Sequence, residues 1–136
     1  MTDRSERHRV VIVEGVPSLR DALRWALEGT PDLTVAGETD SGVEAVALAE
    51  RLQPDLVIVD AGLHPMDGFA VTRILKELPK PPAVLLLAAH CDPPTIQRAD
   101  ESGSDGIAGK DTDWDSLLFA IRHVLGHASP HAGRPV

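Results

Sequence analysis

Short apolar runs alternate with segments of helical periodicity along this sequence, and that alternation restricts the possible folds more than any other feature. The apolar runs are expected strands at residues 9–14, 33–38, 55–60, 83–89 and 105–110. Helical spacing of apolar residues predicts helices at 18–28, 41–52, 68–78, 93–103 and from 114 onward. Strands that are apolar throughout are covered on both faces, so the pattern predicts an α/β fold with an open parallel sheet and helices on both faces.

The composition limits the classes of function open to the chain. At 136 residues, the length fits one domain with one hydrophobic core. The net charge of −8 argues against direct contact between this domain and nucleic-acid phosphates. Cys91 is the only cysteine, so no internal disulfide is possible, and no apolar run reaches the roughly 20 residues that span a bilayer. We therefore expect a cytoplasmic protein without membrane contact.

Three parts are expected along the chain. Residues 9–126 form one ordered domain, because the alternating pattern fills this range. Residues 1–8 are polar and are expected to be a disordered N-terminal segment, while residues 127–136 are expected to be a flexible tail or a linker stub.

Charged side chains stand at the carboxyl ends of the expected strands. Glu14 and Asp60 end the first and third apolar runs, and Lys110 follows the fifth. In an open parallel sheet these strand ends lie at one edge, where ligands bind at the switch point of the strand order. A single carboxylate at a strand end is often only a solvated rim residue or a helix cap. The joint pattern instead predicts that Glu14, Asp60 and Lys110 share one pocket.

The motifs around these residues resemble those of receiver domains of bacterial two-component response regulators. The resemblance rests on "VIVEGVPSLRDAL", "PDLVIVDAGLHPMDGFA", "AVLLLAAH" and "GSDGIAGKD", and it extends over residues 9–126. It implies a flavodoxin-like (βα)5 sheet with strand order 2-1-3-4-5. The segment "GIAGKDTDWDSLLFAIRHV" is most similar to receivers that precede a helix-turn-helix output domain. This similarity implies transcription regulation through a DNA-binding domain in a longer chain.

The resemblance also assigns roles to the matching residues. Asp60 would be the phosphoacceptor, which attacks the phosphohistidine of a histidine kinase. Lys110 would pair with the oxygens of the phosphoryl group. Mg²⁺ would be held by Asp60 together with the acidic residues that end the first strand, of which this chain has Glu14.

Several positions depart from the family pattern. Gly15 stands where a second acidic residue usually ligates Mg²⁺, Ala88 where a Ser or Thr hydroxyl is usual, and Ile107 where an aromatic rotamer switch is common. Since one carboxylate is lost, we expect Mg²⁺ to bind weakly or not at all. His64 and Pro65 stand where Pro and Gly are usual; His64 is either an exposed loop residue or a group close to the phosphoryl site.

Two functions stay open from the sequence. Asp60 and Lys110 favour an ordinary receiver that accepts a phosphoryl group on Asp60. The departures at Gly15, Ala88 and Ile107 favour an atypical receiver, which signals by protein–protein contacts with weak or no Mg²⁺-dependent phosphorylation, and we prefer this hypothesis. An enzyme on the same fold is not expected, because the sequence has no nucleophile elbow, P-loop or dinucleotide-binding glycine motif.

Aromatic residues suggest where a partner could bind. Phe119 lies off the apolar stripe of the last expected helix, and it is a candidate for the face that contacts a partner in a homodimer. Trp25 also lies off the stripe of its helix, and each of these two residues is either part of a partner-contact face or an ordinary isolated exposed apolar residue. Trp114 lies on the stripe and is expected in the core.

Overall fold

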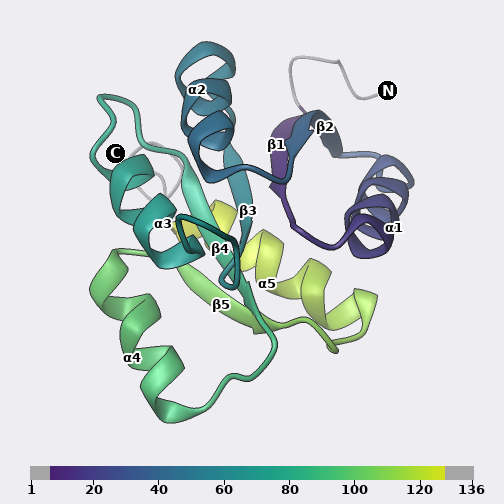
Figure 1. The fold of residues 1–136 in the computed structure, drawn as a ribbon. Coiled ribbons are helices and arrows are strands. Elements are labelled where there is room, and N and C mark those ends of the chain that lie inside the picture. Colours follow the sequence, from purple (N-terminus) through teal and green to yellow (C-terminus); the bar gives the residue numbers. More distant parts are fainter. Residues whose placement is uncertain (1–6, 128–136) are drawn as a thin grey trace.

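The computed structural model describes residues 7–127, and these residues form a parallel five-stranded sheet with the order β2-β1-β3-β4-β5 (Figure 1). The strands are β1 (His8–Val13), β2 (Leu33–Thr39), β3 (Leu56–Asp60), β4 (Ala83–Ala88) and β5 (Gly106–Gly109). Each strand pairs in parallel with its neighbours, so every connection crosses over through a helix. The predicted flavodoxin-like order is confirmed.

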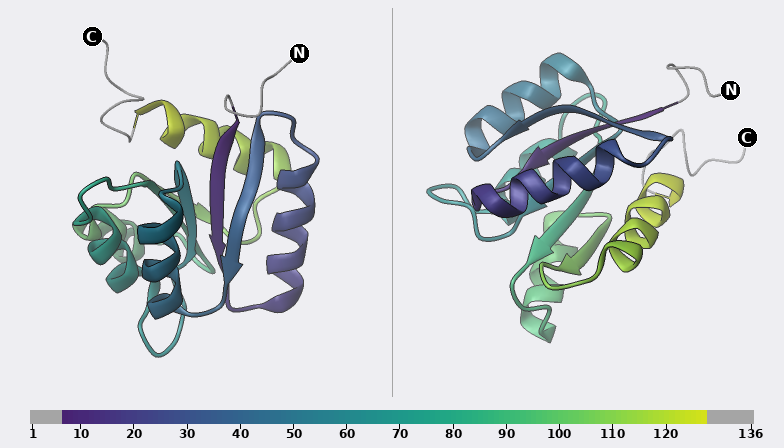
Figure 2. Two further views of the ribbon diagram at one scale, coloured as in Figure 1. Left: turned by 90° about the horizontal axis from the view of Figure 1, so that it is seen from above. Right: turned by 90° about the vertical axis from the view of Figure 1, so that its right-hand side faces the viewer.

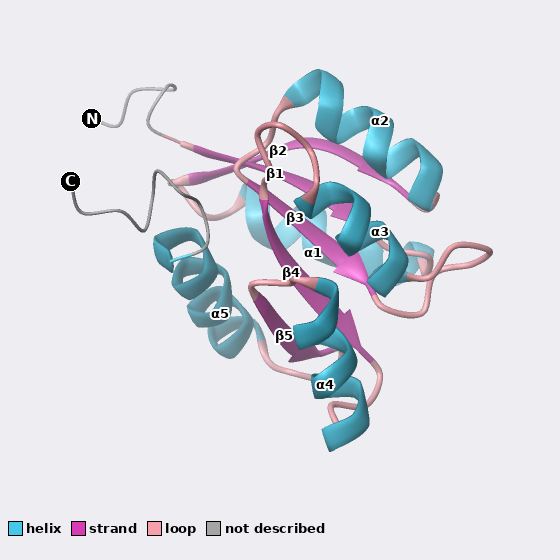
Figure 3. Ribbon diagram, turned by 90° about the vertical axis from the view of Figure 1, so that its left-hand side faces the viewer, coloured by secondary structure: helices cyan, strands magenta, loops and turns pink. Residues whose placement is uncertain are grey.

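Helices cover both faces of the sheet, as predicted (Figures 2 and 3). They are α1 (Pro17–Glu28), α2 (Gly42–Leu52), α3 (Gly68–Lys76), α4 (Pro93–Ser102) and α5 (Trp114–His127). One face packs against α1 and α5, and the other against α2, α3 and α4. Within residues 7–127, no helix is both long and apolar enough to cross a membrane.

The central strand β3 is buried along its whole length. Val57 and Val59 face the layer that contains α2 and α3, while Leu56 and Ile58 face α1 and α5. Because successive side chains of a strand point to opposite faces, an uninterrupted apolar run is what a two-sided core requires. Asp60 ends this run at the carboxyl edge of the sheet.

Capping residues explain where several helices begin. Ser41 precedes α2 and its hydroxyl accepts the N–H of Glu44 at 3.1 Å. Asp67 precedes α3 and its carboxylate accepts the N–H of Ala70 at 2.9 Å. Such caps satisfy backbone N–H groups that have no partner inside the helix. The first helix has no side-chain cap and begins at Pro17, whose fixed φ suits a first helical position.

Some elements differ from their expected ends by one or two residues. β1 begins at His8, inside the segment that we expected to be disordered, because His8 pairs with Leu33 and donates its N–H to the Asp32 carbonyl. α5 extends to His127, one residue into the expected tail, and α3 ends at Lys76, two residues early. The rest of both expected flexible segments lies outside the described residues.

The start of β1 and the end of α5 lie together at the amino ends of the strands. His8, Leu125 and Gly126 line a common pocket at this edge. Beside them, Arg122 of α5 donates to the carboxylate of Asp32 at 2.7 and 3.1 Å. This edge is opposite to the one at which β3 ends.

Candidate functional site

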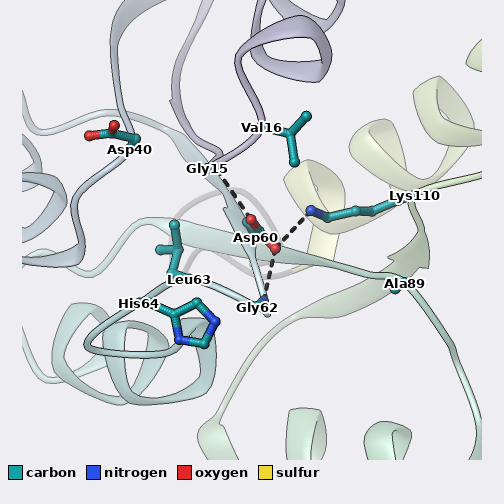
Figure 4. Close-up of a pocket in the computed structure, with 9 residues that line it drawn as sticks. All are labelled: Gly15, Val16, Asp40, Asp60, Gly62, Leu63, His64, Ala89 and Lys110. Carbon is teal, nitrogen blue, oxygen red and sulfur yellow. Dashed lines mark hydrogen bonds and ion pairs between the residues drawn. The ribbon is translucent and has the colours of Figure 1, made fainter.

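Three charged residues from distant parts of the chain meet at the carboxyl edge of the sheet. Asp60 ends β3, Glu14 follows β1, and Lys110 follows β5. The Nζ atom of Lys110 lies 2.9 Å from Asp60 Oδ1 and 2.9 Å from Glu14 Oε2. Figure 4 shows Lys110 and Asp60 pointing toward each other, with Gly15 and Gly62 beside the carboxylate. The structure thus brings together the three residues that the strand ends had suggested.

The Asp60 carboxylate is held by the backbone on both sides. Gly62 donates its N–H to Oδ1 at 2.8 Å, and Gly15 donates to Oδ2 at 3.2 Å. Burial would raise the pKa of Asp60, but the hydrogen bonds from Lys110 and Gly62 outweigh it, and the pKa lies below its ordinary value. Asp60 is therefore an ionised carboxylate at neutral pH, and such a group can act as a nucleophile.

Glu14 is buried more deeply than Asp60 and is less well satisfied. Its Oε2 accepts the N–H of Val16 at 3.0 Å in addition to the Lys110 ammonium. Its Oε1 is buried and has no hydrogen-bond partner among the described residues. Burial raises the pKa of Glu14, the contacts with Val16 and Lys110 lower it, and the neighbouring Asp60 raises it further. The net pKa is above the ordinary value, because burial outweighs the two favourable hydrogen bonds.

Lys110 balances this pair of carboxylates. Burial would lower its pKa, but the contacts with Glu14 and Asp60 raise it above the ordinary lysine value. The backbone fixes its place, because the Lys110 N–H donates to the Ala88 carbonyl at 2.9 Å at the end of the β4–β5 ladder. One ammonium is thus shared between two buried carboxylates.

Gly15 leaves open space where the family usually carries a metal-ligating carboxylate. A Cβ atom at Gly15 would lie 3.4 Å from Asp60 Oδ2 and 3.8 Å from Leu63, both ordinary contact distances. Residues 7–127 contain no group of three His, Cys, Asp or Glu side chains placed to hold a metal ion. The two carboxylates at this edge, Asp60 and Glu14, both contact Lys110, and Mg²⁺ prefers several oxygen ligands.

The Asp60 carboxylate lines a pocket of about 460 Å³, which we call the Asp60 pocket. Besides Gly15, Asp60 and Lys110, its wall includes Asp40, His64 and Ala89 (Figure 4). His64 is therefore both an exposed loop residue and a pocket-lining one. Asp40 was missed in the sequence, although it follows the second strand as Glu14 follows the first.

The two switch positions have only apolar side chains. Ala88 is buried at the end of β4 and offers no hydroxyl to the pocket. Ile107 of β5 is partly buried and packs against the same core cluster as Ala88. A branched aliphatic side chain held in this way has no polar atom to move between two environments.

The aromatic residues fall into two groups. Phe119 on α5 is 74% exposed, and its ring stacks on that of His123 at a centroid distance of 6.4 Å. Trp25 on α1 is 81% exposed. Both aromatic side chains that lie off the apolar stripes of their helices are therefore on the surface. Trp114 is partly buried against the core cluster between the sheet, α1 and α5, as its place on the stripe predicts.

Comparison with known proteins gives one consistent result. Residues 10–122 match the family model described as the response regulator receiver domain. The chain is 34% identical over 115 residues to the response regulator protein VraR of Staphylococcus aureus. This match covers 84% of the present chain and 54% of that protein. The chain is also 38% identical over 123 residues to a protein-glutamate methylesterase/protein-glutamine glutaminase of Myxococcus xanthus. This match covers 86% of the present chain and 35% of that enzyme.

Solved structures agree. The signal receiver domain of the response regulator NarL from Mycobacterium tuberculosis superposes with a TM-score of 0.84 at 29% identity, covering 88% of this chain and 97% of that one. The chain spans about half or less of the length of the curated relatives named above, so the match concerns their receiver portion. The chain belongs to the receiver domain family of two-component response regulators.

Proposed function

We propose that this chain is an atypical receiver domain that signals by protein–protein contacts, with weak or no Mg²⁺-dependent phosphorylation of Asp60. The observation that carries the proposal is the absent side chain at Gly15, next to Asp60 Oδ2. Phosphoryl transfer to a carboxylate needs the negative charge of the incoming group to be neutralised. Because Gly15 supplies no carboxylate, a divalent cation at this site has one negatively charged ligand fewer than in the usual family pattern.

The charge distribution supports this proposal. Asp60 and Glu14 are the acids in contact with Lys110, whose Nζ atom lies 2.9 Å from one carboxylate oxygen of each. A divalent cation has to compete with that ammonium for the same oxygens. Because the pKa of Glu14 is raised, part of its charge is also lost at mildly acidic pH. Both effects weaken cation binding.

The switch positions support signalling that does not depend on a phosphoryl group. Ala88 offers no hydroxyl to such a group, and Ile107 offers no aromatic ring to rotate in response. A modification can only shift a conformational equilibrium through contacts that differ between the two states. Those two contacts are absent from the Asp60 site and its neighbourhood.

An ordinary phospho-accepting receiver is the alternative. The 2.9 Å contact between Lys110 Nζ and Asp60 Oδ1 favours it, and so does the lowered pKa that keeps Asp60 ionised. In this alternative a histidine kinase donates the phosphoryl group to Asp60, and Lys110 then pairs with one of its oxygens.

The decisive experiment restores the missing carboxylate. Amide NMR shifts around Asp60, Ala88 and Lys110 are followed while Mg²⁺ is added in the presence of beryllofluoride. We expect no saturable change in the wild type at millimolar Mg²⁺ and a clear saturable change in Gly15→Asp, because the added side chain lies beside Asp60 without a steric clash. Gly15→Ala is the matched control, since it adds the Cβ without the charge.

Two outcomes would decide against the proposal. Saturation in the wild type at ordinary millimolar Mg²⁺ would establish the phospho-accepting alternative. Loss of partner binding in Asp60→Asn would show that the Asp60 carboxylate is required for signalling. If the amide shifts of Gly15→Asp also fail to change with Mg²⁺, the missing carboxylate at Gly15 is not the cause of weak Mg²⁺ binding.

The proposal extends to partners and location. We place the domain in the cytoplasm, as the non-enzymatic N-terminal part of a transcription regulator whose own DNA-binding output domain contacts DNA. A histidine kinase is its candidate phosphodonor, and a second copy of the chain is its candidate partner through the face that carries Phe119. The net charge of −8 supports the absence of direct nucleic-acid contact by this domain.

A further inference from the structure

Arg98 on α4 makes two contacts with the start of α3. Its guanidinium carbon lies 4.2 Å from the centroid of the Phe69 ring, which is itself buried. Its Nη2 atom lies 3.4 Å from Asp67 Oδ2. Figure 3 shows α3 and α4 side by side on one face of the sheet. Arg98 therefore attaches α4 to α3 through an aromatic face and a carboxylate at once.

Gly68, which lies between the two residues that Arg98 contacts, is packed directly on the backbone of Asp60. Asp67 caps α3 with its other oxygen, Oδ1, which accepts the N–H of Ala70. The next residue, Gly68, donates its N–H to the Ala61 carbonyl at 3.1 Å. A Cβ atom on Gly68 would overlap the carbonyl oxygen of Asp60, so the two backbones are in contact. A continuous series of contacts therefore joins Arg98 to Asp60, through Asp67 and Phe69 and then through the backbone of Gly68.

We propose that Arg98 is a positioning residue that couples α4 to the loop at residues 61–67, and through that loop to Asp60. A shift of α4 changes the contacts of Arg98 with Asp67 and Phe69. The start of α3 then moves relative to the Asp60 peptide. A change at Asp60 is passed to α4 by the same contacts in reverse. The route does not use Ala88 or Ile107, whose side chains lack the usual polar and aromatic groups.

The size of the coupling follows from the exposure of its parts. The Arg98 side chain is 55% exposed and that of Asp67 is 42% exposed, so the ion pair alone contributes little. The stacking on Phe69 adds to it, because that ring is buried and cannot move away. We therefore expect a modest coupling, which a site-resolved method can measure.

Amide hydrogen exchange of the whole chain tests the proposal. In Arg98→Ala we expect residues 61–69 and residues 93–101 to exchange about two- to fivefold faster than in the wild type. Arg122→Ala is the matched control, since Arg122 on α5 is a half-exposed arginine whose carboxylate partner, Asp32, lies away from Asp60. It should leave both segments unchanged. Faster exchange in α4 alone would overturn the proposal, because Arg98 would then be a local surface contact.

A second measurement tests the reverse direction. Asp60→Asn should shift the amide NMR signals of residues 95–101 in the wild-type background and in Arg122→Ala. In Arg98→Ala these shifts should fall by about half or more. Arg98→Lys keeps the cation without the flat guanidinium and should give a value between the two. Equal shifts with and without Arg98 would overturn the proposal. Neither measurement requires Mg²⁺ or phosphorylation, so their failure is distinct from that of the proposed function.

Discussion

Lys110 carries the charge balance of the Asp60 pocket. Two carboxylates that are nearly fully buried would repel each other strongly without a cation between them. The hydrogen bonds from Gly15, Val16 and Gly62 reduce that cost but do not remove it, because they carry no full charge. The pocket therefore depends on Lys110 for its stability as well as for any chemistry.

Removing the ammonium should destabilise the fold. We expect Lys110→Ala to lower the free energy of unfolding by about 3 kcal/mol at neutral pH, because it leaves two buried acids unpaired. Urea denaturation measures the loss. Adding Glu14→Gln to Lys110→Ala removes one of the two charges, and it should recover about half of the loss. A double variant that is less stable than Lys110→Ala would show that the charges are not the cause.

The raised pKa of Glu14 makes a prediction for the pH dependence. The folded state takes up a proton at a higher pH than the unfolded state, whose ordinary pKa is 4.5. The penalty of the buried charge is therefore present above the folded pKa and disappears as the pH falls toward 4.5. Glu14→Gln carries no such penalty, so its free energy of unfolding should exceed that of the wild type near neutral pH.

Urea denaturation between neutral pH and mildly acidic pH checks this difference. It should shrink as the pH falls and vanish near 4.5. Asp60 has the opposite sign: its pKa lies below the ordinary 3.8, so its stabilising contribution is lost only in more acidic solution. The two residues thus act in separate pH ranges. A difference that grows on acidification would contradict the assigned direction for Glu14.

At the scale of elements, the junction between β3 and α3 is the tightest place in the structure near the site. Gly68 begins α3 with its Cα against the Asp60 and Ala61 backbones, and a Cβ there would lie 2.6 Å from the Ala61 Cα. Thr72 strengthens the first turn, since its hydroxyl donates to the Gly68 carbonyl at 2.7 Å. The end of β3 and the start of α3 are therefore in direct backbone contact.

Filling that junction should be costly. We expect Gly68→Ala to lower the free energy of unfolding by about 3 kcal/mol or more, because the methyl group meets backbone atoms that cannot turn away. Gly126→Ala on α5 is the control: nothing lies within 4 Å of its Cβ, and alanine should stabilise the helix by about 1 kcal/mol or less. Thermal unfolding of both variants measures the contrast. Equal effects would show that the junction tolerates a side chain.

The sequence predicted the bounds of α2 to within one residue but placed the end of α3 two residues too late. Ser41 marked the start of α2 because its hydroxyl has a fixed task at that position. The end of the same helix is set by Gln53, which adopts a left-handed conformation at φ 47° that its residue type does not favour. The end of α3 came two residues before the expected one, as the backbone turns at Glu77, whose N–H donates to Ile74. Backbone turns of this kind depend on packing, which periodicity alone does not describe.

At the scale of the whole molecule, the sequence predicted the meeting of Glu14, Asp60 and Lys110 because strand ends converge by topology. It did not predict Arg98 on Phe69. That contact depends on how α3 and α4 are rotated and shifted relative to each other, and helical spacing does not specify this packing. Asp40 was missed because the second strand was expected to end at Glu38, whereas β2 extends to Thr39 and Asp40 is the residue that follows it.

The surface around Phe119 should govern self-association. Phe119 is a large apolar side chain exposed on α5, and exposed aromatic residues often dominate interfaces. We expect Phe119→Asp to weaken homodimerisation by about tenfold or more, measured by sedimentation equilibrium. Trp25→Asp, on the outward side of α1, is the matched control and should leave the dimer intact. A dimer that survives Phe119→Asp but not Trp25→Asp would move the interface to α1.

The positions of His8, where β1 begins, and His127, where α5 ends, have a practical consequence. Both lie at the amino ends of the strands, one strand length from the Asp60 pocket, which is about 17–20 Å for strands of this size. A fluorophore, surface linker or fused module attached at either end therefore leaves the pocket open to solvent. A module fused directly to His127 would begin at the edge of the sheet opposite to that pocket.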